Sequence, residues 1–150
     1  MALKQRIQDD LKAALLSGDR FVAETLRGLK AAILNEEVAQ NKRDEGLDDA
    51  TIELIIAKEV KKRNEAAMLY DQNMRQDSAE DERREAKTLV AYLPEQLNDA
   101  EIKTVVDAKI VELNATDIKM MGQVISAVKQ DVGNAANGAT VARLVKEALS

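Results

Sequence analysis

The sequence predicts an all-α protein with two parts, an N-terminal bundle of about four helices and a small C-terminal domain of three helices. Apolar residues recur every three or four positions over most of the 150 residues, as they do on one face of an α-helix. The only proline, Pro94, cannot continue a helix and biases Leu93 toward an extended backbone. We therefore expect a hinge at Leu93 and Pro94, with domains at residues 1–93 and 94–150.

Two helices are expected before a polar loop at residues 41–49. The first ends near Gly18, and Asp19 can cap the second because its carboxylate accepts backbone N–H groups. Gly28 lies inside the second helix, where glycine costs about 1 kcal/mol relative to alanine, and close helix packing would explain its presence. The apolar faces are Leu3, Ile7, Leu11 and Leu15 in the first helix and Val22, Leu26, Leu29 and Ile33 in the second.

A third helix is expected to begin at Asp48 or Asp49 and to reach Tyr70 or beyond. The sequence from Ser78 to Asp81 has the spacing of a capping box, which predicts the start of a fourth helix there. The apolar faces are Ile52, Ile55, Ile56, Val60, Ala67 and Tyr70 in the third helix and Ala79, Ala86, Leu89, Val90 and Leu93 in the fourth.

Charged side chains also lie on these core-facing stripes. Glu59 and Arg63 are four residues apart and point in the same direction as the apolar residues of the third helix. A charge that faces a core must be paired, and an antiparallel fourth helix would bring Glu82 or Glu85 to Arg63. We expect a half-buried ion-pair network of these four residues. The alternative is that Arg63 anchors a ligand or a phosphate.

Three more helices are expected beyond Pro94. Asn98 and Glu101 have capping-box spacing, a turn follows at residues 114–117, Gly133 ends the next helix, and Thr140 can cap the last. The apolar faces are Ile102, Val105, Val106, Ile110 and Leu113; then Met120, Met121, Val124, Ile125, Val128 and Val132; and finally Val141, Leu144, Val145 and Leu149.

The charge balance argues against a strongly basic nucleic-acid binder. The net charge is −5, with 16 basic and 19 acidic residues up to position 92 and six basic and eight acidic residues after it. A phosphate contact would therefore need a local basic patch. No apolar run reaches the length of about 20 residues that spans a bilayer, and the N-terminus does not resemble a signal peptide. We expect a cytoplasmic protein without membrane contact.

Common catalytic groups are missing from the composition. The chain has no histidine and no cysteine, which removes the usual general base, the thiolate nucleophile and the common zinc ligands. Its four serines lie outside nucleophile-elbow sequences, and no glycine-rich phosphate loop is present. We expect no catalytic residue, no metal and no cofactor, and therefore no enzyme that acts alone.

Two groups of basic residues are candidates for nucleic-acid contact. On the third helix these are Lys58, Lys61 and Lys62, although a solvated helix face mixed with acids is the more usual explanation for such a cluster. In the C-terminal part, Gly122 would let a phosphate backbone approach, or it would be a close packing contact beside Met120 and Met121. The basic candidates of that part are Lys119, Lys129, Arg143 and Lys146.

The chain resembles the YqeY family over essentially its whole length. The residues that carry the resemblance are Thr25–Ile33 with Asn35 and Glu36, Lys58–Arg63, Arg75 with Asp77, Glu85 followed by Tyr92–Leu97, Met121–Val124 and Leu144–Lys146.

The resemblance implies a relationship to the C-terminal tail of GatB, a subunit of the tRNA-dependent amidotransferase. In that enzyme the tail helps to hold tRNA while catalysis happens elsewhere. A label of carbon–nitrogen ligase with glutamine as amide donor would be inherited from the shared domain. The resemblance therefore implies a non-catalytic tRNA-binding-like accessory protein, with tRNA or a tRNA-processing protein as partner. The alternative is a helical adaptor between proteins without nucleic acid, and the sequence does not set the oligomeric state.

Overall fold

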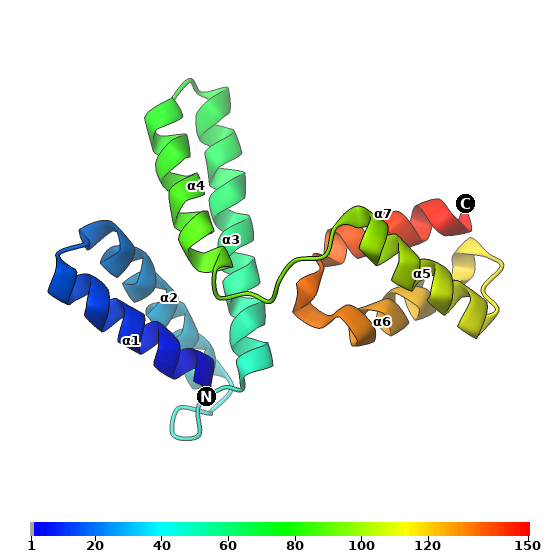
Figure 1. The fold of residues 1–150 in the computed structure, drawn as a ribbon, viewed down its shortest axis with the longest axis horizontal. Helices are drawn as coiled ribbons and strands as arrows, with labels where there is room; N and C mark the ends of the chain where they lie inside the picture. The colour runs from blue at the N-terminus through cyan, green and yellow to red at the C-terminus, as the bar shows by residue number, and fades with distance from the viewer. Residues whose placement is uncertain (1) are drawn as a thin grey trace. The chain divides into compact units, whose positions relative to one another are not determined.

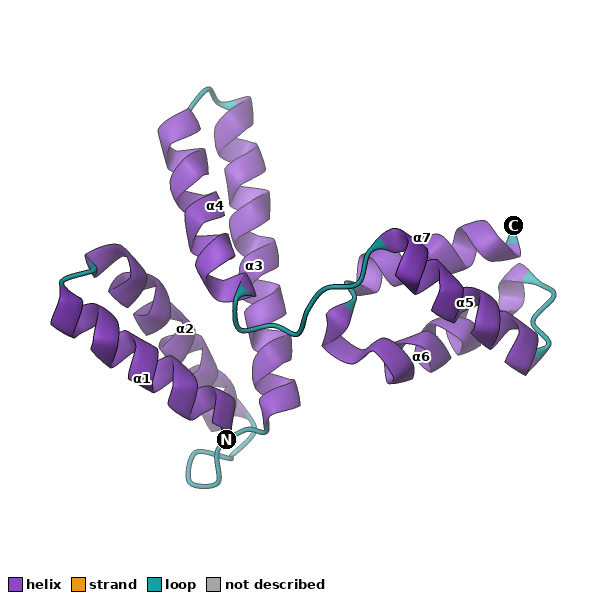
Figure 2. Ribbon diagram, viewed as in Figure 1, coloured by secondary structure: helices purple, strands orange, loops and turns teal. Residues whose placement is uncertain are grey.

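A computed structural model describes residues 2–150, and these residues form α-helices and two short 3₁₀ helices without any strand (Figures 1 and 2). The all-α prediction is therefore confirmed. The chain divides into two compact units, unit 1 up to Leu93 and unit 2 from Pro94 onward. No helix within the described residues is long and apolar enough to cross a bilayer.

Unit 1 contains α1 (Ala2–Ser17), α2 (Arg20–Ala39), α3 (Asp49–Gln72) and α4 (Gln76–Val90). These helices form two hairpins, because α1 packs mainly against α2 and α3 mainly against α4 (Figure 1). Arg84 links the two hairpins, with its guanidinium 3.9 Å from the centre of the Phe21 ring. The largest buried apolar side chains of this unit are Ile7, Leu26, Leu29, Ile33, Leu47, Ile52, Ile56 and Leu89.

Side-chain caps begin two helices of unit 1 where the sequence predicts them. The Asp19 carboxylate accepts the backbone N–H of Val22 at 3.2 Å, and the Asp48 carboxylate accepts that of Thr51 at 2.8 Å. Each bond satisfies one of the backbone donors that a helix N-terminus leaves without a partner.

The predicted cap at Ser78 is wrong, because α4 begins at Gln76 and Ser78 lies inside it. The chain reverses earlier, at Met74, whose φ of 59° lies in the left-handed region. The backbone N–H of Arg75 then bonds to the carbonyl of Tyr70 at 2.8 Å, which closes the turn before Ser78 is reached.

Unit 2 contains α5 (Asp99–Leu113), α6 (Met121–Val132) and α7 (Gly138–Leu149), with 3₁₀ helices η1 (Ile118–Met120) and η2 (Gly133–Ala135). Its core is entirely aliphatic, because Phe21, Tyr70 and Tyr92 are the only aromatic residues of the chain and all precede Pro94. The buried members are Ile102, Val106, Ala115, Val124, Val128, Val141, Leu144 and Val145.

The capping box that opens α5 is confirmed: the Asn98 side chain accepts the Glu101 N–H at 2.8 Å, and the Glu101 carboxylate accepts the Asn98 N–H at 3.5 Å. Gly133 ends α6 with a φ of 54°, as expected. The predicted cap at Thr140 is wrong. Asn137 caps α7 instead, by accepting the Ala139 N–H at 2.7 Å, so the helix begins before Thr140.

The connection between the units is short on both sides of Pro94. Leu93 packs against the core of unit 1, and Leu97 packs against the core of unit 2. The Leu97 N–H donates to the carbonyl of Ala135 at 2.8 Å, which fastens the start of unit 2. Only residues 94–96 therefore separate the two anchored leucines, and the hinge at Leu93 and Pro94 stays a prediction.

Candidate functional site

Arg63 lies between α3 and α4, with 16% of its side chain exposed. Its Nη1 donates to Glu59 Oε2 at 2.8 Å, and its Nε donates to Glu85 Oε2 at 3.2 Å. Glu82 is half-buried and makes no ion pair within the described residues. Burial and then the charge of Glu85 raise the pKa of Glu82, whereas Arg63 lowers it. The Arg63 side chain is thus occupied by two carboxylates from within the protein.

Gly28 lies on the exposed side of α2 near this network. A Cβ atom at Gly28 would meet only the Arg63 guanidinium, at 3.8 Å, which is an ordinary van der Waals distance. Close helix packing does not require a glycine there, so the packing interpretation of Gly28 is wrong. No contact in the structure explains this glycine.

Arg143 is the one C-terminal candidate that is already occupied. Its Nη2 donates to Asp99 Oδ2 at 2.7 Å, and its Nη1 donates to Glu147 Oε1 at 3.3 Å. These hydrogen bonds raise the pKa of Arg143. Two nearby carboxylates would therefore compete with any phosphate for this guanidinium.

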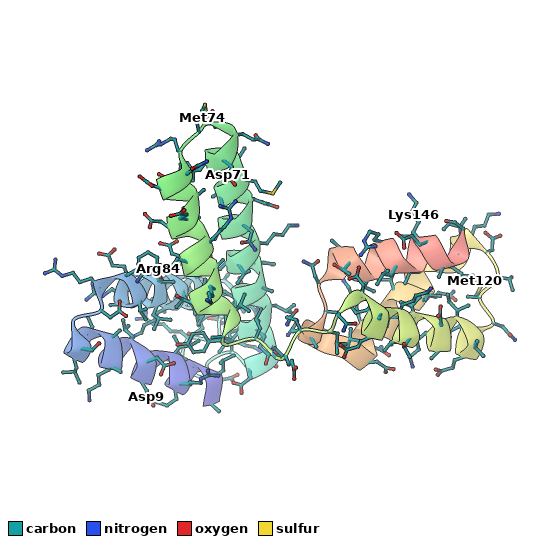
Figure 3. All side chains as sticks on the ribbon, turned by 45° about the horizontal axis from the view of Figure 1, so that its top comes forward. Asp9, Asp71, Met74, Arg84, Met120 and Lys146 are labelled. Carbon is teal, nitrogen blue, oxygen red and sulfur yellow. The ribbon has the colours of Figure 1, made fainter. Side chains whose placement is uncertain are left out.

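Lys119 and Lys146 make no ion pair within the described part of unit 2 and are exposed. Lys119 lies in η1, just before α6, and Lys146 lies in the last turn of α7. The start of α6 and the end of α7 lie at the same end of the unit (Figure 1). Figure 3 shows the Lys146 side chain projecting outward from α7. Lys129 lies at the opposite end, where its Nζ would be 3.1 Å from a Cβ atom placed on Gly138. Two of the four basic candidates therefore come from elements at the same end of unit 2.

Gly122 lies beside Lys119, in the first turn of α6. A Cβ atom built on Gly122 would meet nothing within 4 Å, so the interpretation of this glycine as a packing contact is wrong. Gly122 is exposed to solvent, in a helix turn that follows η1 directly, and the N–H of the preceding Met121 already donates to the carbonyl of Ile118.

Lys58, Lys61 and Lys62 are exposed on α3 and make no ion pair within residues 2–150. Lys58 and Lys62 line a groove between α2 and α3 with a volume of about 570 Å³, whereas Lys61 lies outside it. The sequence predicted that the three lysines lie close together on one helix. It could not predict which residues of α2 face them, because that depends on how α2 and α3 pack. The other lining residues are Ala32, Asn35, Glu36, Ala39, Gln40, Thr51, Leu54, Ile55 and Glu59.

One buried charge was missed by the sequence reasoning. Glu37 is 2% exposed, and its carboxylate oxygens accept Lys4 Nζ at 2.9 and 3.1 Å. Its position was nevertheless readable, because Glu37 follows Ile33 by four residues and thus continues the buried stripe of α2. The buried Glu37 carboxylate is thus paired, as a buried charge requires, by a lysine whose side chain is 30% exposed.

Tyr92 was also missed as a contact residue. Its hydroxyl donates to Asp10 Oδ2 at 2.6 Å, and the Arg6 guanidinium lies 4.7 Å from the centre of its ring. Burial, followed by the hydrogen bond to Asp10, raises the pKa of Tyr92. The partners are 82 positions apart along the chain, so no sequence spacing could have revealed the contact.

The described residues contain no group of three or more acidic side chains arranged to hold a metal ion. The ion pairs that the described residues form lie both within helices, as in Arg63–Glu59, and between helices, as in Arg63–Glu85.

Comparison with known proteins found two relatives, both named altered inheritance of mitochondria protein 41, mitochondrial. The protein from Kluyveromyces lactis is 33% identical over 121 residues, which cover 79% of this chain and 59% of the relative. The protein from Clavispora lusitaniae is 26% identical over 137 residues, which cover 89% of this chain and 78% of the relative. The chain thus spans less than two thirds of the first relative.

The names of these relatives correct one expectation. Both are mitochondrial proteins by name, which points away from a purely cytoplasmic location, so the expectation of a cytoplasmic protein is overturned.

The family model described as Yqey-like protein matches residues 4–149. The match covers almost the entire sequence, and the chain therefore belongs to the YqeY family.

Proposed function

We propose that this chain is a non-catalytic accessory protein that contacts tRNA through unit 2, as the resemblance to the GatB tail implies. The observation that carries the proposal is the pair of unpaired lysines, Lys119 and Lys146, at one end of unit 2 (Figures 1 and 3). The exposed backbone of Gly122 lies beside Lys119 and leaves room for a phosphate group.

The chemistry of this end suits a phosphate backbone. Lysine ammonium groups attract phosphate oxygens, and the first N–H groups of a helix favour anions because the positive end of the helix dipole lies there. Arg143 contributes less, since Asp99 and Glu147 already hold its guanidinium. We therefore propose a small phosphate-contacting surface made of Lys119, Gly122 and Lys146.

The relationship to the amidotransferase is proposed at the level of its tail only. A glutamine-dependent carbon–nitrogen ligase needs a nucleophile to release ammonia, and the chain has neither a cysteine nor adjacent serines. Pure protein should release no ammonia from glutamine. Measurable release would overturn the non-catalytic assignment.

An adaptor between proteins is the second candidate function. Unit 2 carries six basic and eight acidic residues, and this negative balance opposes general attraction to nucleic acid. The described surface also exposes several large apolar side chains that a protein partner could cover; examples are Leu16, Val38, Met74 and Val111.

A salt titration of tRNA binding separates the two functions. Phosphate contacts make the affinity fall steeply with salt, and each lost contact should reduce the slope of log K against log salt by about 0.7–0.9. The double variant Lys119→Glu and Lys146→Glu should weaken binding and flatten this slope. The control is Lys103→Glu, on an exposed part of α5; it reverses one charge instead of two and should cost less than half of the affinity change, in free energy, of the double variant.

The outcomes are decisive in both directions. Absence of binding even at low salt would remove tRNA as a partner and leave the adaptor. If the loss of binding free energy per reversed charge is the same in the double variant and in Lys103→Glu, the loss reflects the overall charge of the protein. Lys119 and Lys146 would then form no specific binding surface.

A further inference from the structure

We propose that the groove between α2 and α3 binds an acidic, amphipathic helix of a partner protein. The groove lies entirely within unit 1 and has a volume of about 570 Å³. It therefore forms a surface separate from the end of unit 2 that is proposed to contact tRNA. From the sequence alone, its lysines Lys58 and Lys62 were candidates for nucleic-acid contact or a solvated helix face.

The dimensions of the groove suit a short helix. Its lining runs from Ala32 to Gln40 on α2 and from Thr51 to Lys62 on α3. At 1.5 Å per residue these stretches are about 12 and about 17 Å long, which matches two to three turns of a bound helix. A groove between two helices is also the usual receptor for an amphipathic helix, whose apolar face enters it.

Part of the groove is apolar even though it faces solvent. Leu54 is 54% exposed and Ile55 is half-buried, and both contribute to the lining together with Ala32 and Ala39. A single exposed leucine on a convex surface needs no explanation. Leu54 lies instead at a concave site, where a partner side chain could bury it.

The unmatched charge in the groove is positive. Lys58 and Lys62 make no ion pair within the described residues. Glu59 is neutralised by Arg63, whose Nη1 donates to it at 2.8 Å, whereas Glu36 accepts only the neutral Gln40 Nε2 at 2.6 Å and keeps its charge. Two lysines against one carboxylate without a cationic partner leave the lining positive. Charge complementarity therefore selects a partner helix with carboxylates beside its apolar face.

The same lining disfavours RNA. Leu54 and Ile55 offer neither a positive charge nor a hydrogen-bond donor to a phosphate backbone. The residues of the groove include no aromatic ring on which a base could stack, which is how single-stranded nucleic acid is commonly held. A peptide helix uses both the apolar and the basic side chains, so it is the occupant that the groove favours.

The test uses three fluorescent peptides with the full-length protein. Each peptide is a helix of about 14 residues, or four turns, with leucines at i, i+4 and i+7. The positions that flank the leucines are Glu in one peptide, Gln in the second and Lys in the third. Fluorescence anisotropy should show the tightest binding for the Glu peptide and the weakest for the Lys peptide. This difference should shrink as salt is added, because exposed charges are screened.

Two variants locate the binding surface. Leu54→Gln should weaken the Glu peptide roughly tenfold, because burial of a leucine side chain is lost. The double variant Lys58→Glu and Lys62→Glu should reverse the preference, so that the Lys peptide binds more tightly. The matched controls are Leu16→Gln and the double variant Lys12→Glu and Lys30→Glu, at exposed residues outside the groove. They should leave the order of the peptides unchanged, and thermal melts should verify that all variants fold.

Several results would overturn the proposal. These are binding of none of the peptides, equal binding of all three, or wild-type affinity in Leu54→Gln. Loss of tRNA binding in the Lys58 and Lys62 double variant, with peptide binding intact, would assign the two lysines to nucleic acid. The Lys119 and Lys146 double variant should retain peptide binding, so failure of the tRNA proposal remains distinguishable from failure of this one.

Discussion

At the scale of single residues, Arg63 is the cation at the centre of an ion-pair network in unit 1. It contacts carboxylates from both α3 and α4, and half-buried Glu82 adds a further negative group nearby. An isolated surface ion pair contributes little to stability, whereas an ion pair that is shielded from water becomes costly to break. Arg63 is shielded in this way, with 16% of its side chain exposed.

We expect Arg63→Met to lower the free energy of unfolding by about 2–4 kcal/mol, because Glu59 and Glu85 would lose their partner in a partly desolvated place. Denaturant unfolding at neutral pH measures the loss. Arg83→Met is the control, since Arg83 pairs with Asp71 at the surface and should lose less than about 1 kcal/mol. Equal losses in the two variants would mean that the Arg63 network behaves as an ordinary surface pair.

Charged residues could be predicted from the sequence better than glycines. Glu59 and Arg63 share a face because of their spacing along one helix, and that spacing holds however the helix packs. Gly28 and Gly122 could not be interpreted in the same way. A glycine has no side chain whose direction the helical spacing could predict, so its role depends on its neighbours in the three-dimensional structure.

At the scale of helices, Tyr92 fastens the end of α4 to α1. Its hydroxyl donates to Asp10, its ring lies beneath the Arg6 guanidinium, and Arg6 Nη2 also donates to the carbonyl of Ala91 at 3.4 Å. The residue that follows, Leu93, packs into the same core. These contacts hold the end of α4 in place just before Pro94.

We expect Tyr92→Phe to lower the free energy of unfolding by about 1–3 kcal/mol, because Asp10 loses a charge-assisted hydrogen bond. The wild-type protein should also lose stability as the pH rises above about 10, where a phenol in the unfolded chain ionises while folded Tyr92 keeps its proton. The stability that the raised pKa of Tyr92 contributes is fully present below about pH 10. Denaturant unfolding across this range should show that Tyr92→Phe lacks the alkaline loss, and Tyr70→Phe is the control that keeps it.

The sequence predicted the helices from their apolar stripes, but their starts less reliably. Ser78 and Thr140 have the right chemistry for caps, yet the chain turns into the helix earlier, at Met74 and Asn137. The groove was not predictable, because its depth depends on how α2 and α3 pack. Leu54 gave a partial signal as an apolar residue outside the core-facing stripe of α3.

At the scale of the whole molecule, each unit encloses an apolar core of its own. Ile56 belongs to the core of unit 1 and Ile102 to that of unit 2, and both are at most 1% exposed. Residues 94–96 are the covalent connection between the leucines anchored in these cores. Separate cores permit separate unfolding.

We expect Ile102→Ala and Ile56→Ala each to cost about 2–5 kcal/mol, because each leaves a cavity in a close-packed interior. Only the unit that carries the substitution should lose stability, and the free energy of unfolding of the other unit should not change. Amide hydrogen exchange followed residue by residue measures this, with the unsubstituted unit as the internal control. Faster exchange throughout the chain after either substitution would show that the two units unfold together.

The uneven distribution of aromatic residues has a practical consequence for anyone who studies this protein by spectroscopy. Phe21, Tyr70 and Tyr92 all precede Pro94, and the chain has no tryptophan. Intrinsic fluorescence and near-ultraviolet circular dichroism therefore report on the first 93 residues and give no signal from the remainder. An apparently simple melting curve recorded with either signal would describe only 93 of the 150 residues.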